Sequence, residues 1–329
     1  MKQENKLESE FLTIGRKDGV EATLSTLGAG VYSLHYKGVP MILELADREE
    51  YLSCPMCFGK TLGRVAGRIP SSFRLGEEDV HLKEEAPGIC LHGGCDTSLT
   101  YQKFHSEVVS NSKGTTVFFM KESKDGENGF PGNLKVEISY FFPVDREEMT
   151  ITFRSLSDKD TVVNLSNHMY FNFAGSMDIN DYHLHIDASN MASFKEGTEL
   201  PNGIVPVCKA LDFHDNPRMG ERMDATEKEI PLVHNFDHFL AFDIMDPRVP
   251  QVTFSGNGFK MDILTDYEGV NCYCDQSMKR IEFNNRLGLM KRRALAIEPE
   301  KCNFPLEGLL LKAGQEYKHF ATYRFSLDK

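Results

Sequence analysis

A histidine, His168, lies in a stretch of the sequence where amide and aromatic side chains alternate. The segment Asn164–Gly175 reads NLSNHMYFNFAG, and this alternation predicts a half-buried strand. Because a buried amide is costly unless it is hydrogen-bonded, Asn164, Asn167 and Asn172 must bond either to nearby backbone or to a polar ligand. The segment is therefore a candidate wall of a polar site. A histidine held in a satisfied network near a strand end is the alternative.

Two arginines lie four residues apart between glycines in the segment GRVAGRIP, at 63–70. Glycine lets the backbone approach a ligand closely, and a guanidinium group can hold two hydroxyl groups or one carboxylate. Arg64 and Arg68 are therefore candidates for ligand binding. An exposed arginine pair on a loop would give the same pattern.

Two further motifs place a histidine or an acid where its side chain could project into a site. His92 precedes a flexible Gly-Gly turn, and Asp237 lies between aromatic residues in the segment FDHF, at 236–239. Sites for polar small molecules combine apolar walls with a few placed polar groups, and a carboxylate beside aromatic rings suits a sugar. A turn histidine and a capped loop would explain the same residues.

A glutamate, Glu298, ends an apolar strand in the segment IEPE, at 297–300. Burial would raise the pKa of its carboxyl toward neutral pH, which a general base requires, whereas a strand-end acid in water would have no such role. Glu300 follows two residues later. An extended chain would place both side chains on one face, with the Cα atoms about 7 Å apart. Two carboxylates at so short a distance would titrate as a coupled pair.

Short strands must position these residues, because turn residues punctuate the chain and helical periodicity longer than three turns is absent. The clearest predicted strands are 31–36, 134–142, 149–154, 259–265, 270–274, 294–297 and 319–327, with one helical turn at 44–52. The segment 143–146 is predicted to be a turn between antiparallel neighbours that lead into the Asn164 strand. Many short strands with almost no helix predict one all-β domain over residues 1–329, a large antiparallel sandwich or barrel.

Composition limits the classes of partner. The 329-residue chain is 40% hydrophobic and carries a net charge of −12, which disfavours nucleic acid or an anionic membrane and favours a neutral or cationic small molecule. The N-terminal residues lack the apolar core of a signal peptide, and no run approaches the ~18 apolar residues of a membrane span. We therefore expect a cytoplasmic protein, as a monomer or homodimer.

Eight cysteines in a chain of this kind are expected to be reduced thiols. Cys54 and Cys57 have the spacing of a redox motif, but no βαβ pattern surrounds them and no second Cys-x-x-Cys completes a zinc site. Cys90 and Cys95 flank the His-Gly-Gly turn. Packing is the expected role of all four.

Together the motifs resemble, in order and approximate spacing, those of the aldose 1-epimerases (galactose mutarotases). The matching segments are GRVAGRIP, LHGG, DGENGFPG, NLSNHMYFN, LPNGIVPV, FDHF, GVNCY and AIEPEKCNFP, and the resemblance extends from Val20 to Tyr317. It implies a large antiparallel β-sandwich with very little helix, which binds a sugar in an open cleft.

The resemblance also implies an activity, the interconversion of the α and β anomers of a free aldose without a metal or organic cofactor. Glu298 would take the proton from the anomeric hydroxyl and His168 would protonate the ring oxygen, from opposite sides of the hemiacetal. The ring would open, the C1–C2 bond would rotate, and closure would give the other anomer.

The positions that bind sugar hydroxyls in this family are matched by Arg68, His92 and Asp237, and Arg64 is a weaker match. Some positions depart from the family pattern. Gly67 stands where asparagine is usual, and Glu300 where glutamine is usual. The sequence contains no tryptophan to stack on a sugar.

Two interpretations from other classes stay open at this stage. His92, His168 and Glu298 could form a metal site with two histidines and one carboxylate. Alternatively, the fold could serve as a sugar-binding or regulatory module without turnover, which the altered positions around the sugar permit.

Overall fold

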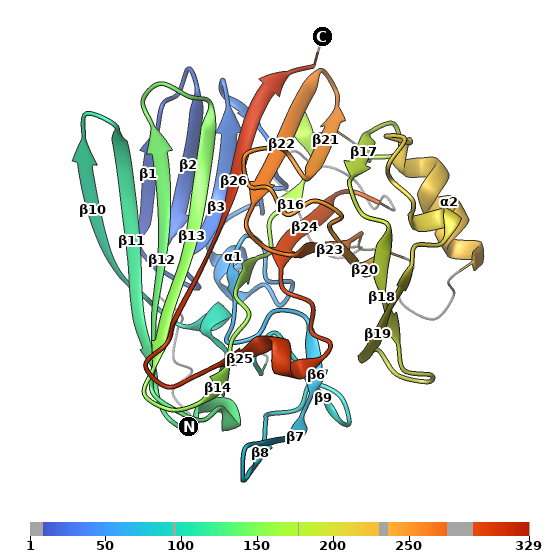
Figure 1. Ribbon diagram of the computed structural model, residues 1–329. Helices are drawn as coiled ribbons and strands as arrows, with labels where there is room; N and C mark the ends of the chain where they lie inside the picture. The colour runs from blue at the N-terminus through green and yellow to red at the C-terminus, as the bar shows by residue number, and fades with distance from the viewer. Residues whose placement is uncertain (1–8, 95–96, 177, 230–235, 275–291, 329) are drawn as a thin grey trace.

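The computed structural model describes residues 9–94, 97–176, 178–229, 236–274 and 292–328. These residues form mostly β-structure, and every pairing between the strands described is antiparallel. Figure 1 shows β1–β3 stacked beside the long strands β10–β13, while β17–β20 and α2 lie on the other side of the molecule. The predicted antiparallel sandwich is confirmed.

Three sheets carry most of the strands. The first is β1 (Phe11–Gly15), β2 (Val20–Ser25), β3 (Gly30–Tyr36) and β4 (Val39–Pro40). The second runs β10 (His105–Asn111), β11 (Gly114–Ser123), β12 (Leu134–Pro143), β13 (Glu148–Ser157), β26 (Glu316–Leu327), β22 (Phe259–Thr265), β21 (Val252–Gly256) and β17 (His183–Ile186). The third runs β16 (Tyr170–Phe171), β24 (Leu295–Glu300), β23 (Gly269–Tyr273), β20 (Asp237–Ala241), β18 (Asn190–Phe194) and β19 (Pro201–Pro206).

Short strand pairs and two helices complete the described fold. The pairs are β5 (Thr61–Leu62) with β15 (Ser166–Asn167), β6 (Arg68–Pro70) with β9 (Ile89–Leu91), β7 (Ser72–Leu75) with β8 (Glu78–His81), and β14 (Thr161–Val162) with β25 (Leu310–Leu311). The helices are α1 (Arg48–Ser53) and α2 (Met219–Glu229). No helix in the described part of the chain is long and apolar enough to cross a membrane.

The main core lies between the first two sheets and continues under the third. Alternate residues of β12 and β13, such as Ile138 and Ile151, are fully buried against Ala22 and Leu34 of the first sheet. Each large apolar side chain buried in this way contributes about 1.5–3 kcal/mol relative to an exposed one. The period-two pattern of β12 and β13 predicted these faces correctly.

The Asn164 segment differs from the single strand that alternation predicted. It forms two two-residue strands, β15 and β16, then a 3₁₀ turn at Phe173–Gly175, and nearly all of it is buried on both faces. The strand beside β13 is β26 and not this segment. The amide side chains of this interrupted segment donate to backbone carbonyls of Gly59, Ser176 and Lys301.

The helix predictions were partly wrong. The predicted turn at 44–52 is α1, which begins only at Arg48, where the Asp47 side chain accepts a hydrogen bond of 2.7 Å from the Glu50 N–H. The helix α2 was not predicted. Its sequence is polar, and Met219 and Met223 are the residues it buries within the part whose side chains are described.

Candidate active site

The backbone on both sides of His168 fixes the position of its imidazole ring. His168 lies between β15 and β16, where its N–H donates to the Lys60 carbonyl at 3.0 Å and its carbonyl accepts from the Gly59 N–H at 2.8 Å. The Tyr170 ring packs against the imidazole with a centroid distance of 4.7 Å. The ring is therefore held by main-chain bonds and by an aromatic neighbour, and its side chain is 5% exposed.

Glu298 approaches this histidine from the middle of the third sheet. It lies on β24 directly opposite Asn271 of β23 and is 1% exposed. Its Oε1 atom lies 3.4 Å from Nε2 of His168. The two residues named as base and acid from the sequence are thus brought together.

The prediction that they stand on opposite sides of a hemiacetal concerns a bound sugar, and the two side chains themselves are close neighbours. At 3.4 Å they are side by side. The anomeric hydroxyl oxygen and the ring oxygen of a pyranose are both bonded to C1, so two neighbouring groups can reach both oxygens from one side. Two titratable groups held in contact could therefore exchange protons with both oxygens at one carbon.

The environment of Glu298 makes its carboxylate a stronger base than a free glutamate. Burial raises its pKa well above the ordinary value, and the nearby Glu300 and Asp237 raise it further, whereas Arg68 acts in the opposite direction. Its Oε2 atom is buried and has no hydrogen-bond partner within the described ranges. A buried oxygen that lacks a donor is a natural acceptor for a ligand hydroxyl.

Arg68 links two acids beside this pair. It contacts Asp237 through Nη1 and Glu199 through Nε, each at 2.8 Å. Burial opposes the ionisation of Asp237, but Arg68 and the amide of Asn271 outweigh it and hold the pKa of Asp237 below its ordinary value. The sequence prediction named Arg68 and Asp237 but missed Glu199, which follows no recognisable motif except its place just before LPNG.

His92 reaches the site from the turn after β9. The Gly67 N–H donates to its Nδ1 at 3.1 Å, so a neutral His92 carries its proton on Nε2. Burial lowers the pKa of His92 well below the ordinary value, and His168 and Arg68 add to this effect. Its ring lies edge-on to that of His168, at a centroid distance of 5.6 Å. His92 is therefore a neutral hydrogen-bond donor next to His168.

The side-chain N–H groups of the three asparagines around His168 all donate to backbone carbonyls. Asn164 donates to the Lys301 carbonyl at 2.9 Å, Asn167 donates to the Gly59 carbonyl at 2.7 Å, and Asn172 donates to the Ser176 carbonyl at 2.9 Å. Backbone bonding, one of the two explanations offered by the sequence, accounts for the N–H groups of all three residues. The side-chain oxygens of Asn167 and Asn172 are buried without a hydrogen-bond partner in the described part of the chain.

Arg64 is not a sugar-binding residue in this arrangement. Its side chain is buried, and its guanidinium donates to the Ser123 hydroxyl and to four carbonyl oxygens at 2.9–3.0 Å. The carbonyls belong to Ser123, Lys124, Pro131 and Gly132. Because its donors are used within this loop, we withdraw Arg64 from the predicted binding residues.

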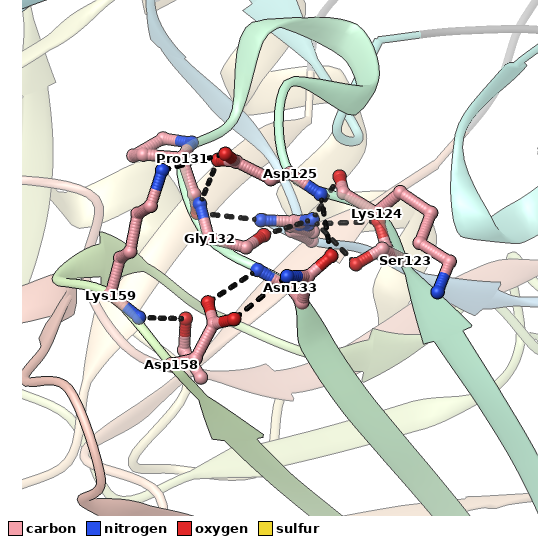
Figure 2. A network of polar contacts seen from close by, with 10 residues as sticks. Ser123, Lys124, Asp125, Pro131, Gly132, Asn133, Asp158 and Lys159 are labelled. Atoms are coloured by element: carbon pink, nitrogen blue, oxygen red, sulfur yellow. Dashed lines mark hydrogen bonds and ion pairs between the residues drawn. The ribbon is translucent and has the colours of Figure 1, made fainter.

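The same loop is tied to the end of β13 by a second set of contacts. Figure 2 shows Asp125 accepting from the Gly132 N–H and from Lys159, each at 2.6 Å. Asn133 donates to Asp158 at 2.7 Å. The guanidinium of Arg64 therefore fills the centre of a loop that is also held from outside.

We expect Arg64→Met to destabilise the fold by about 3–5 kcal/mol, because four carbonyl oxygens lose their donor. The KM for the sugar should not change in the protein that remains folded. Denaturant unfolding and kinetics measure the two effects separately. Arg154→Met, at an exposed position on β13, is the matched control and should change stability by less than about 0.5 kcal/mol. A raised KM in Arg64→Met would return Arg64 to the binding site.

The proposed metal triad of His92, His168 and Glu298 is not formed. Across the described ranges, one group of possible metal ligands has its ligand atoms within 4.8 Å of one another, and it consists of Asp187, His214 and Asp243. It shares no residue with the proposed triad. In addition, Nδ1 of His92 already accepts a backbone hydrogen bond. The geometry therefore favours proton transfer over metal ligation at this site.

Cys54 and Cys57 are free, buried thiols. Burial raises the pKa of both, to about 11 for Cys57, whose sulfur lies 3.4 Å from the Tyr101 hydroxyl. Cys90 is also free and buried, which agrees with the packing role expected for these residues. Cys95 lies outside the described residues.

Known proteins resemble this chain over almost its whole length. The family model for aldose 1-epimerase matches residues 10–324. The chain is 29% identical to galactose mutarotase of Mus musculus, over 95% of this chain and 93% of that protein, and 26% identical to aldose 1-epimerase of Escherichia coli K12, over 96% and 94%. The crystal structure of galactose 1-epimerase from Lactobacillus acidophilus superposes with a TM-score of 0.87 at 22% identity, covering 98% of this chain and 100% of that one. The chain belongs to the aldose 1-epimerase family.

Proposed function

We propose that this protein interconverts the α and β anomers of a free aldose, with Glu298 as the general base and His168 as the general acid. The observation that carries the proposal is the 3.4 Å approach of Glu298 Oε1 to His168 Nε2 in a buried setting. Family membership supports the activity, and the relatives named galactose mutarotase make galactose the first sugar to test.

The reaction needs two proton transfers and no other chemistry. Glu298 accepts the proton of the anomeric hydroxyl while His168 donates a proton to the ring oxygen, and the C1–O5 bond breaks to give the open-chain aldehyde. Rotation about C1–C2 presents the other face of the aldehyde. The ring oxygen then attacks C1 with the proton roles reversed, and both residues return to their starting states. The side chains supply the acid and the base, so no cofactor is required.

Three further residues are proposed to bind the sugar hydroxyls. The Arg68–Asp237 pair offers donors and acceptors in a rigid arrangement, and His92 offers a neutral N–H next to the acid. Such groups orient the sugar, so that the reacting oxygens meet the acid and base. We further propose a single domain over residues 1–329, a cytoplasmic location, and a monomer or homodimer.

Fresh sugars test the activity directly. We expect the protein to accelerate the approach of α-galactose to anomeric equilibrium in proportion to its concentration, measured by polarimetry or by NMR of the anomeric protons. Glucose, xylose, arabinose and fucose in the same assay would define the sugar. Folded protein that accelerates none of the five would contradict the proposal and favour a binding module.

A further inference from the structure

A second glutamate lies on the same face of β24 as the base. Glu300 is two residues after Glu298, and the strand continues through Pro299 to Glu300, which lies opposite Gly269 of β23. Side chains two residues apart on a strand point the same way, with Cα atoms about 7 Å apart. The extended geometry that would place both side chains on one face is therefore present.

Glu300 lies next to two glycines. Its neighbour across the sheet is a glycine, and a Cβ atom added at Gly67 would lie 3.4 Å from Glu300 Oε1. Glu300 is 2% exposed, and its Oε2 atom, like that of Glu298, has no hydrogen-bond partner in the part of the chain that the structure describes. Two buried acids thus face the same space.

Among the described residues, few groups around the pair can offset its charge. Within those ranges, the titratable groups that interact with the two glutamates are His168, Arg68, Asp237, Cys57, Cys272, Cys302, Tyr267, Tyr317 and Tyr323. Burial raises the pKa of these thiols and phenols, so they stay neutral. Apart from the acid His168, only Arg68 in this set can carry a positive charge, and it already contacts Asp237 and Glu199.

We propose that Glu300 is a positioning residue for the reaction, a second buried carboxylate whose negative charge strengthens Glu298 as a base. The inference rests on the proposed function, because it assigns a role relative to the base. Burial raises the pKa of both carboxyls well above the ordinary value, and Glu300 adds to the rise at Glu298. A general base needs a pKa above that of a free carboxylate to be effective near neutral pH, and the charge of Glu300 acts in the direction of a higher pKa.

The size of the effect follows from the separation of the charges. If the charges are separated by about as much as the Cα atoms, roughly 7 Å, then in the effective dielectric of a partly buried site they shift each other's titration by about 1–2 pH units. Glutamine at this position has the same shape and no charge. The acidic limb of the kcat/KM profile reports the base of the free enzyme, so it should move to lower pH by this amount in Glu300→Gln.

The experiment compares pH profiles for three proteins with fresh α-galactose, or with the best aldose of the panel. We expect Glu300→Gln to shift the acidic limb downward by about 1–2 pH units, so that the variant is relatively more active in acid. Its plateau should fall severalfold because the base is weaker. Glu307→Gln, at an exposed position near the C-terminal end of the chain, should leave the profile unchanged.

A second measurement does not depend on activity. The carboxyl carbon of Glu298 can be followed by NMR in selectively labelled protein, where the parent should titrate in two coupled steps and Glu300→Gln in one step at lower pH. If Glu300→Gln does not fold, Glu300→Asp keeps the charge and should keep the parent's acidic limb.

Specific results would overturn the inference. An unchanged acidic limb in Glu300→Gln, a change confined to KM, or a single-step titration of Glu298 in the parent would each contradict it. These results would leave the proposed function standing, because the parent would still interconvert anomers. A parent that accelerates no sugar would instead contradict the proposed function itself.

Discussion

Replacing Glu298 with glutamine is expected to lower kcat by about 10²–10⁴-fold, the usual contribution of a general acid or base. Glutamine keeps the shape of the side chain and its place on β24 opposite Asn271. It cannot accept the proton of the anomeric hydroxyl. Because the contacts of Arg68 and Asp237 with the sugar would remain, KM should change little, and the loss should appear in kcat and kcat/KM alike.

The same substitution should not reduce stability. The pKa of Glu298 is raised in the folded state. Its contribution to the free energy of unfolding is therefore most favourable below the unfolded-state pKa, and it is lost as the pH rises through the folded-state pKa. At neutral pH the Glu298 carboxyl therefore ionises more easily in the unfolded chain than in the native protein, and this lowers the free energy of unfolding. Glu298→Gln removes this penalty, and its free energy of unfolding should exceed that of the parent at neutral pH and match it near pH 4.

Two measurements separate the chemical effect from a folding defect. Denaturant unfolding across pH tests the stability prediction, and anomeric NMR gives kcat, with Glu307→Gln as the matched exposed control. A variant that is stable and nearly as active as the parent would show that another carboxylate is the base. Glu300 would then be the first candidate.

The sequence predicted best what depends on local pattern. The faces of β12 and β13 follow from alternation alone, because both strands pack one face on the core. The sequence also named Glu298 and His168, 130 positions apart, because each lies in a family motif, and the structure brings the two side chains together. Their side-by-side placement was not predicted, since it depends on β16 pairing with β24.

The two arginines of GRVAGRIP show why the other parts of the site could not be predicted from the sequence. They are four residues apart and equally suited to bind a ligand by type, yet Arg64 is enclosed by the loop around Ser123 and Gly132, while Arg68 contacts Asp237. The difference comes from which distant segment covers each side chain, and no local pattern records that. The same holds for Glu199, whose partner Arg68 is remote in sequence.

Replacing His168 with asparagine should lower kcat by about 10²–10⁴-fold, because the ring oxygen would then leave C1 without a proton donor. The backbone bonds of residue 168 to Gly59 and Lys60 are made by main-chain atoms, so they survive the change. The fold should therefore remain intact.

The double variant distinguishes a shared step from two independent ones. Acid and base at 3.4 Å act on the same carbon in one step, so Glu298→Gln with His168→Asn should be little slower than either single variant, far from the product of the two losses. His105→Asn, an exposed histidine on β10, is the control and should keep full activity. Near-full activity in His168→Asn would assign the acid role to His92, whose ring lies 5.6 Å away, and multiplicative losses in the double variant would mean that the two groups act in separate steps.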